Sequence, residues 1–167
     1  RPDITAAIDG YLEGLKALTP AQRSDALREY YGFIGADTYP IRGSVLSWEQ
    51  VLEMKQHGFT IGSHTHTHAI LETCDDDTIL RELVTSRDIL ADRLGRVPEM
   101  FCFPNARYRL EHQRLLERAG YKWAFTMDNR SLRISDSCYF LPRIAVDERI
   151  SWQPSYLRLR LLGFPGY

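Results

Sequence analysis

The chain has 167 residues, of which 44% are hydrophobic and 26% charged, a size and composition that suit one packed domain. Its 21 basic and 22 acidic side chains leave a net charge of -1, which provides no long-range field for attracting nucleic acid or an anionic membrane. We therefore expect no nucleic-acid partner. We also expect no membrane span, because no apolar run approaches the roughly 20 residues that a span requires.

The three cysteines give no sign of a disulfide framework or of a cysteine-based zinc site. Cys74, Cys102 and Cys138 are widely spaced, odd in number and without a C-x-x-C pair. This usage favours a reducing compartment, so we expect a cytoplasmic location. The first residues do not resemble a signal peptide, but the chain starts at Arg1 rather than at a methionine, which leaves an upstream targeting segment open.

The first third of the chain is predicted to be helical. Apolar residues recur at helical spacing over residues 4–18, and a threonine-proline pair then opens a second helix over 19–31. Residues 37–44 contain a proline and a glycine and are predicted to form a loop. The segment Ser47-Trp48-Glu49-Gln50 is a capping box that begins a third helix, and Gly58 is its natural end.

Further along, short apolar runs alternate with helical patterns. The expected strands cover residues 59–63, 100–103 and 121–126, followed by an apolar segment over 139–146. The expected helices between them run from an N-cap at Asp77 to Gly95, and from Arg109 to Ala119. This alternation predicts a parallel sheet with right-handed crossovers. Because sites gather where parallel strands end, residues 64–68, 104–108 and 128–130 should share one rim. The tail over 156–162 allows either a strand or a helix.

A run of alternating histidines follows the first expected strand directly. Neutral imidazole is a common metal ligand, and two imidazoles four residues apart can converge on one ion. Either His64 and His68 bind a metal as a pair, or His66 joins them as a third ligand if the segment stays extended. The competing interpretation is a set of polar loop residues. His57 and His112 fall on expected helices and are predicted to be surface residues.

Other candidate residues also have structural interpretations. The acidic triplet over 75–77 is predicted to mark a helix start rather than a metal site, because carboxylates suit the positive end of a helix dipole. Cys102, with no evident cationic neighbour, is predicted to be a small core residue rather than a nucleophile. Asp128 follows the third strand and is either a site carboxylate or part of a turn with Asn129.

Segments from about Leu46 to Val146 carry four motifs in a fixed order. His64, Thr65 and His68 match H-[ST]-x-x-H. Phe101-Cys102-Phe103-Pro104-Asn105-Ala106 is similar to F-x-[YP]-P-[YFN]-G, Ala119 to Thr126 is similar to A-G-[YF]-x-x-A-x-T, and Leu141-Pro142-Arg143-Ile144 matches L-P-R-I. Together these segments resemble the polysaccharide deacetylases, the carbohydrate esterases of family 4 with a NodB-homology domain.

The resemblance implies an α/β fold, namely a partial or distorted (β/α) barrel of the polysaccharide deacetylase type with extra N-terminal helices. We expect a single domain over residues 1–167, with a helical N-terminal segment (1–45), a deacetylase-like core (46–147) and a C-terminal tail (148–167). The implied activity is metal-dependent hydrolysis of acetyl groups, by N- or O-deacetylation, on an acetylated carbohydrate.

The resemblance also implies roles for individual residues. His64 and His68 would hold a divalent metal ion, expected to be zinc, together with an aspartate. Such an ion lowers the pKa of a bound water from ~15.7 toward ~7 and polarises the acetyl carbonyl. The backbone N–H of Asn105 would help to hold the oxyanion. Arg143 stands where the best-known form of the family has a histidine acid; because arginine keeps its proton at neutral pH, Arg143 would act as an orienting charge.

One family motif is absent from the sequence. The family's T-F-D-D-G-type motif supplies the general base and the aspartate ligand, and the nearest imitation here is Asp9, in a helical pattern. We expect that an upstream part of a longer protein has been removed. The alternative is an inactive deacetylase-like domain that binds carbohydrate or has a structural role. The general acid, the general base and the oligomeric state stay unassigned.

Overall fold

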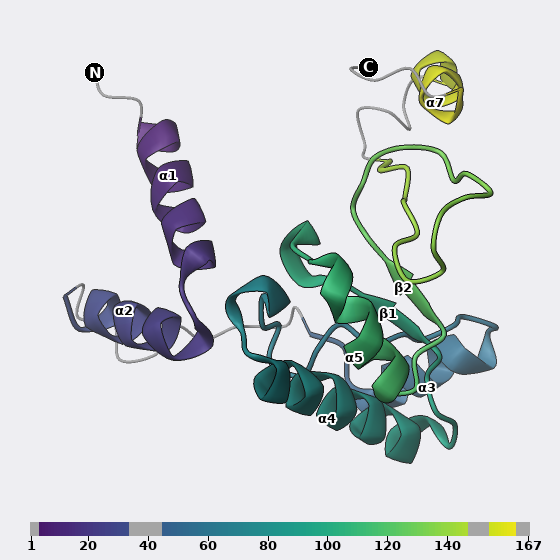
Figure 1. Ribbon diagram of the computed structural model, residues 1–167, viewed down its shortest axis with the longest axis horizontal. Coiled ribbons are helices and arrows are strands. Elements are labelled where there is room, and N and C mark those ends of the chain that lie inside the picture. Colours follow the sequence, from purple (N-terminus) through teal and green to yellow (C-terminus); the bar gives the residue numbers. More distant parts are fainter. Residues whose placement is uncertain (1–3, 34–44, 147–153, 163–167) are drawn as a thin grey trace.

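The computed structural model describes residues 4–33, 45–146 and 154–162 of the chain (Figure 1). Its helices are α1 (Ile4–Ala17), α2 (Pro20–Phe33), α3 (Trp48–Gln56), α4 (Asp76–Leu94), α5 (Gln113–Arg118) and α7 (Pro154–Leu161). Three short 3-10 helices are η1 (Leu71–Thr73), η2 (Pro104–Ala106) and η3 (Leu110–His112). The strands are β1 (Met100–Cys102) and β2 (Trp123–Phe125). The expected mixture of helices and parallel strands is confirmed.

The sheet is parallel and follows the order of the sequence. β1 pairs with β2 in a register that places Phe101 opposite Ala124. Isolated parallel bridges continue the sheet on both sides, joining Ser63 to Phe101 and Phe125 to Leu141. Four segments thus lie side by side with their carboxyl ends in one direction, which is the arrangement of part of a barrel wall.

The expected strand over 59–63 was too long. Only Ser63 pairs with the sheet: its N–H donates to the Met100 carbonyl at 2.9 Å, and its carbonyl accepts the N–H of Cys102 at 2.9 Å. A strand is defined by such pairing, so the apolar run before Ser63 approaches the sheet without joining it.

The core lies between the sheet, α4, α5 and the segment after the histidine run. Its most enclosed apolar side chains include Ile79, Leu83, Phe101, Phe103, Leu115, Leu116 and Ala124. Phe103 stacks on Phe140 with ring centroids 5.9 Å apart, and its ring meets that of Phe101 edge-on at 5.2 Å. This packing fixes the end of β1, from which Pro104 and Asn105 leave the sheet.

Local capping signals set two of the helix starts. The Ser47 hydroxyl accepts the N–H of Gln50 at 3.3 Å, while the Gln50 side chain accepts the N–H of Ser47 at 2.8 Å, so the expected capping box is confirmed. The acidic triplet also begins a helix, but the N-cap is Asp75 and not Asp77. Asp75 accepts the N–H of Thr78 at 2.7 Å.

The two N-terminal helices form an arm beside the core (Figure 1). No described residue of α2 is buried, and Thr19 caps this helix in partnership with Gln22, whose side chain accepts the Thr19 N–H at 3.1 Å. The arm meets the core through an ion pair of 3.0 Å between Glu13 and Arg107. At the other end of the chain, the tail forms the helix α7 rather than a strand. None of the helices in the described parts combines the length and apolarity that crossing a bilayer requires.

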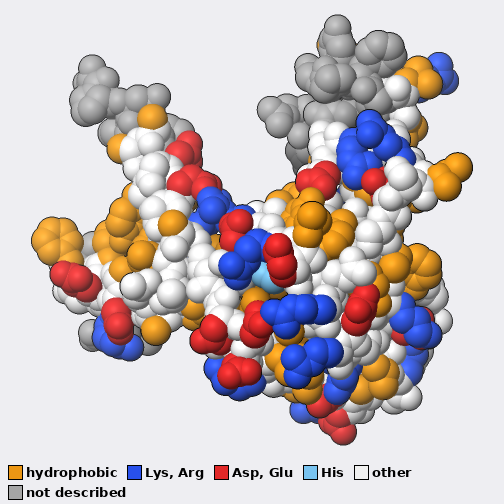
Figure 2. Space-filling model, in the orientation of Figure 1, with side chains coloured by type: hydrophobic (Ala, Val, Ile, Leu, Met, Phe, Trp, Pro, Cys, Tyr) orange, Lys and Arg blue, Asp and Glu red, His pale blue; other side chains and the backbone are white. Residues whose placement is uncertain are grey.

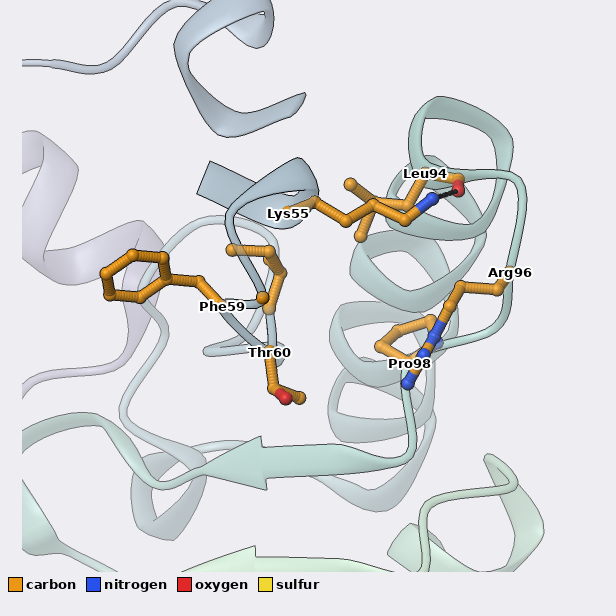
Figure 3. Close-up of a pocket in the computed structure, with 8 residues that line it drawn as sticks. Lys55, Phe59, Thr60, Leu94, Arg96 and Pro98 are labelled. Atoms are coloured by element: carbon orange, nitrogen blue, oxygen red, sulfur yellow. Dashed lines mark hydrogen bonds between the residues drawn. The ribbon is translucent and has the colours of Figure 1, made fainter. Parts of the chain in front are cut away.

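A small cavity of about 200 Å³ lies at the amino end of β1, between α3 and the end of α4 (Figure 3). Lys55 reaches across it and donates a hydrogen bond of 2.6 Å to the carbonyl of Leu94, the last residue of α4. A cation placed there satisfies an open carbonyl and meets the negative end of the helix dipole. This cavity therefore has a structural explanation, and it lies away from the histidine run.

Candidate functional site

The carboxyl ends of the four parallel segments converge on an open pocket of about 460 Å³. It is lined by His64, His68, Cys102, Phe103, Asn105, Met127 and Arg143. The bridge at Ser63, the strands β1 and β2, and the bridge at Leu141 each lead directly into one part of this lining. The fold thus brings together all four of the site residues that the sequence indicates, namely His64, His68, Asn105 and Arg143.

His64 and His68 form a close pair. Their ring centroids are 4.9 Å apart and the rings are inclined at 74°. His64 Nδ1 lies 2.7 Å from the carbonyl oxygen of Cys102, and a proton assigned to Nδ1 makes this a hydrogen bond that leaves the Nε2 lone pair free for a metal. Burial, and then the nearness of His64, lower the pKa of His68, which favours the neutral ring that metals bind. The donor set fits two ligands of a divalent ion.

A third ligand is not found beside this pair. Among residues 4–33, 45–146 and 154–162, no group of three or more His, Cys, Asp or Glu side chains is placed to hold a metal. The alternative of three histidine ligands is therefore not supported. His66 lines a neighbouring groove, which His64 also borders, and not the pocket that His64 and His68 share. Asp9 is exposed on α1.

The loop between the two histidines has a strained backbone. Thr65 and His68 adopt φ values of 64° and 59°, in the left-handed region that β-branched residues such as threonine rarely enter. The hydroxyl of Thr65 is buried and has no hydrogen-bond partner within the described residues. Such a conformation persists only when surrounding contacts hold it, and it is common at functional sites.

Buried hydroxyl groups fix the start of this loop to α4. Ser63 Oγ lies 2.6 Å from Ser86 Oγ, and Ser86 also approaches the hydroxyl of Tyr121 at 3.4 Å. Tyr121 in turn donates to the carbonyl of Leu83 at 3.0 Å. Because all of these polar groups have partners, the network can be buried without leaving an unpaired donor or acceptor.

The turn after β1 also contains two residues in the left-handed region, of which the alanine carries the steric penalty. Asn105 and Ala106 have φ values of 54° and 57°, and the turn is closed by the N–H of Arg107, which donates to the Pro104 carbonyl at 3.2 Å. Alanine stands where the family motif has glycine, the residue that enters this region without a steric penalty. The backbone of Asn105, which lines the pocket, is thus held in an unusual conformation.

We expect Ala106→Gly to raise the free energy of unfolding by about 0.5–1 kcal/mol. The left-handed conformation costs a residue with a Cβ atom about 1–2 kcal/mol, and the greater freedom of glycine in the unfolded chain offsets part of that gain. Urea unfolding would measure the change. The matched control is Ala91→Gly inside α4, where glycine should lower stability by about 1 kcal/mol. Equal destabilisation by both changes would contradict the explanation.

Arg143 is anchored by the ends of the neighbouring strands. Its Nε–H donates to the carbonyl of Thr126 at 2.8 Å, and its backbone N–H donates to the carbonyl of Asp128 at 3.1 Å. The guanidinium also lies beside Cys102, so the expectation that this cysteine has no cationic neighbour was wrong. Burial nevertheless outweighs the arginine and raises the pKa of the Cys102 thiol, which agrees with a packing role.

Asp128 belongs to the rim but is not among the residues that line the pocket with the histidines. Its carboxylate accepts a hydrogen bond of 2.8 Å from the Tyr108 hydroxyl, and burial together with this carboxylate raises the pKa of Tyr108. The side chain of Asn129 accepts the N–H of Ala145 at 3.2 Å. Both residues therefore tie the loop after β2 to its surroundings.

The same loop is closed further out by an ion pair. Two bonds of 2.8 Å join the guanidinium of Arg130 to the carboxylate of Asp136, which also accepts the N–H of Arg133 at 2.7 Å. Hydrogen bonds from Arg130 and then from the backbone of Arg133 lower the pKa of Asp136 to about 2. The loop after β2 is thus held by an ion pair as well as by packing.

His112 was expected at the surface, but it is buried, with 2% of its area exposed. The N–H of Arg109 donates to its Nδ1 at 3.1 Å; the Arg109 Nε is 3.3 Å from Nε2, and a neutral ring can accept only one of these two donors. Burial, followed by the charge of Arg109, lowers the pKa of His112 to about 4. Its spacing from Leu115, Leu116 and Ala119 matches one helix face, a signal that would have predicted burial.

Charged side chains of both signs are interspersed over the face shown in Figure 2, without a large area of one sign. Orange apolar side chains lie between them on the core and on the helical arm. This distribution agrees with the net charge of -1. This face therefore provides no one-signed field to steer a charged ligand.

Known proteins share both the sequence pattern and the fold. The chain is similar to YxkH of Bacillus subtilis (strain 168), which is named as a polysaccharide deacetylase, with 24% identity over 143 residues that make up 86% of this chain and 50% of the relative. The chain thus spans about half the length of this relative. It also resembles the Streptococcus pyogenes deacetylase PplD in complex with acetate, with 25% identity and a TM-score of 0.67 over 72% of this chain and 53% of PplD.

A second solved structure, BC0361, a polysaccharide deacetylase from Bacillus cereus, has the same fold at 22% identity and a TM-score of 0.54, covering 63% of this chain and 33% of that one. The family model for polysaccharide deacetylase matches residues 15–124, which is more than half of the chain. This match includes the histidine run, β1 and the start of β2. The chain belongs to the polysaccharide deacetylase family.

Proposed function

We propose that this chain carries one side of the catalytic centre of a metal-dependent hydrolase that removes acetyl groups from a carbohydrate. The observation that carries the proposal is the single pocket lined by His64, His68, Asn105 and Arg143. Membership of the family supports carbohydrate deacetylation. The likeness to PplD adds to this support, because that deacetylase was solved with acetate, the product of acetyl hydrolysis.

In this proposal, His64 and His68 supply two ligands of a divalent metal, for which zinc is the expected ion. The carbonyl of Cys102 fixes the ring of His64, as outer partners of metal-binding histidines do. When bound, the ion supplies Lewis-acid polarisation of the acetyl carbonyl and lowers the pKa of water. The third ligand, an aspartate in the family, is assigned to a carboxylate from outside the described residues.

Two further residues act on the substrate in this proposal. The backbone N–H of Asn105 donates to the oxygen that becomes negative when water adds to the acetyl carbon. Arg143, whose Nε–H is bound to the Thr126 carbonyl, adds a permanent positive charge to the lining of the same pocket. Because arginine stays charged, it orients the anion or a neighbouring acid and does not itself transfer a proton.

We also propose that residues 46–147 form the reacting core of a single domain. In this arrangement, residues 1–45 add a helical segment and residues 148–167 add a tail. The proposal is supported by the position of the pocket, since every residue of its lining falls within the core range. The substrate is an acetylated carbohydrate, with its sugar and the N- or O-acetyl linkage unassigned.

The proposal is tested by zinc titration and by acetate release from an acetylated chito-oligosaccharide. Both measurements use this chain and a longer version with upstream residues of its own gene. We expect this chain to bind one zinc ion and the longer version to release acetate, because the longer version can supply the missing carboxylate. Absence of zinc binding and of acetate release in both would contradict the proposal. Oligosaccharide binding without acetate release in both would favour the non-catalytic alternative.

A further inference from the structure

Glu82, half-buried on α4, reaches the middle of the histidine loop, defined here as residues 64–68. One carboxylate oxygen, Oε2, accepts the backbone N–H of His66 at 2.9 Å and that of Thr67 at 2.8 Å. The other oxygen, Oε1, accepts the hydroxyl of Thr67 at 2.8 Å. A single side chain therefore satisfies two successive backbone donors and one side-chain donor between the two proposed metal ligands.

The position of Glu82 on α4 matches that of Ser86, which holds the residue before the loop. Glu82 and Ser86 are four residues apart, so they lie on one face of the helix. Ser86 binds Ser63, and Glu82 binds the backbone over 66–67. The helix α4 thus holds both the residue before the loop and the loop backbone at residues 66–67.

These contacts explain how the loop keeps its strained backbone. The left-handed residues Thr65 and His68 lie immediately on either side of the pair that Glu82 holds. A backbone in a sparsely populated region relaxes unless its neighbours are fixed. Relaxation at either residue would move the imidazole rings of His64 and His68, now 4.9 Å apart, away from their present orientation.

We infer that Glu82 is a positioning residue for the metal pair: its carboxylate fixes the loop backbone so that His64 and His68 can bind one ion. This inference rests on the proposed function, because it concerns the same metal. The hydrogen bonds of Glu82 go to His66 and Thr67, neither of which lines the pocket. Glu82 acts through the amides of His66 and Thr67, and its negative charge strengthens those hydrogen bonds.

The chemistry of Glu82 predicts a graded series of variants. Glu82→Ala removes all three hydrogen bonds. Glu82→Gln keeps one oxygen for the two amides, and its NH₂ group can donate to the Thr67 hydroxyl, so it should restore much of the geometry. Thr67→Val removes only the hydroxyl contact. Asp92→Ala, almost three turns further along α4, removes an exposed carboxylate of the same helix and serves as the matched control.

The test is zinc affinity by calorimetry on the full chain, with amide hydrogen exchange at His66 and Thr67 in the absence of metal. Glu82→Ala should weaken zinc binding by about 10–100-fold, the usual effect of losing an outer partner of a metal site. It should also speed exchange at both amides by at least about tenfold. Glu82→Gln should recover most of the affinity, and Asp92→Ala should change neither measurement.

The outcomes separate this inference from the proposed function. If the unmodified chain binds zinc and Glu82→Ala binds it equally well, the positioning role is wrong while the proposed metal pair stands. If the unmodified chain and the longer version both fail to bind zinc, the proposed function fails and the inference falls with it. Equal losses of zinc affinity in Glu82→Gln and Glu82→Ala would also overturn the positioning role. A thermal unfolding curve for each variant shows whether a loss of affinity comes from a general loss of folding.

Discussion

His64→Ala and His68→Ala are each expected to weaken zinc binding by more than about a hundredfold. Among the residues that the structure describes, two imidazoles line the pocket, and each change removes one of them. Removal of a direct ligand should exceed the 10–100-fold effect of losing an outer partner. The same variants should abolish acetate release in the longer version. Calorimetric titration of zinc into the full chain measures the first effect.

His66→Ala is the matched control, because this histidine is in the same loop but outside the pair. Its side chain lines the neighbouring groove, while its contact with Glu82 uses the backbone N–H, which alanine keeps. We expect its zinc affinity to stay within about threefold of the unmodified chain, since no ligand is removed. If His66→Ala lost zinc as completely as His64→Ala, the two-histidine assignment would give way to a three-histidine site.

His112 should make the stability of the protein fall by about 3 kcal/mol as the pH drops from 6.5 to 4. The pKa of His112 is about 4 in the folded protein, against 6.5 in its unperturbed state. Between pH 6.5 and 4, His112 is protonated in the unfolded chain but largely neutral in the folded protein, so stability rises with pH. Each unit of difference corresponds to about 1.4 kcal/mol. Above pH 6.5 both states are neutral and the contribution disappears.

Urea unfolding at several pH values would reveal this contribution. His112→Gln keeps an acceptor for the N–H of Arg109 but cannot take up a proton in this range, so its stability should fall less steeply between pH 6.5 and 4. His57→Gln, at the exposed end of α3, should retain the full slope of the unmodified chain. An identical slope in His112→Gln and the unmodified chain would show that this buried ring does not control the acid response.

The sequence predicted those features that depend on neighbouring residues or on regular spacing. The capping box at Ser47 is local chemistry, and the alternation of helices and apolar runs sufficed to predict a parallel sheet. The meeting of His64 and Asn105 in one pocket followed from the rule that parallel strands end at one edge, whereas Arg143 was indicated only by the family motif. Their chemical roles stay predictions, as does the division of the chain into segments.

Other features depend on contacts between distant parts of the chain, which no local pattern encodes. From the sequence alone, Glu82 is predicted to be an ordinary polar residue of an amphipathic helix. Its contacts with the histidine loop depend on how α4 packs against that loop. The guanidinium of Arg143 beside Cys102 is likewise a product of the sheet order. The burial of His112 is different, because its helical spacing from Leu115 and Leu116 already places it on the buried face of the helix. The surface position was predicted instead because histidine is polar.

The ion pair between Arg130 and Asp136 and the buried ring of His112 respond to acid in different pH ranges. Asp136 has a pKa of about 2, so its pairing is lost only as the pH falls from the ordinary aspartate value of 3.8 toward 2. The acid effect of His112 falls mainly between pH 6.5 and its folded pKa of about 4, which lies above that range. Acidification should therefore weaken the packing around His112 at a higher pH than it weakens the loop that Arg130 and Asp136 close.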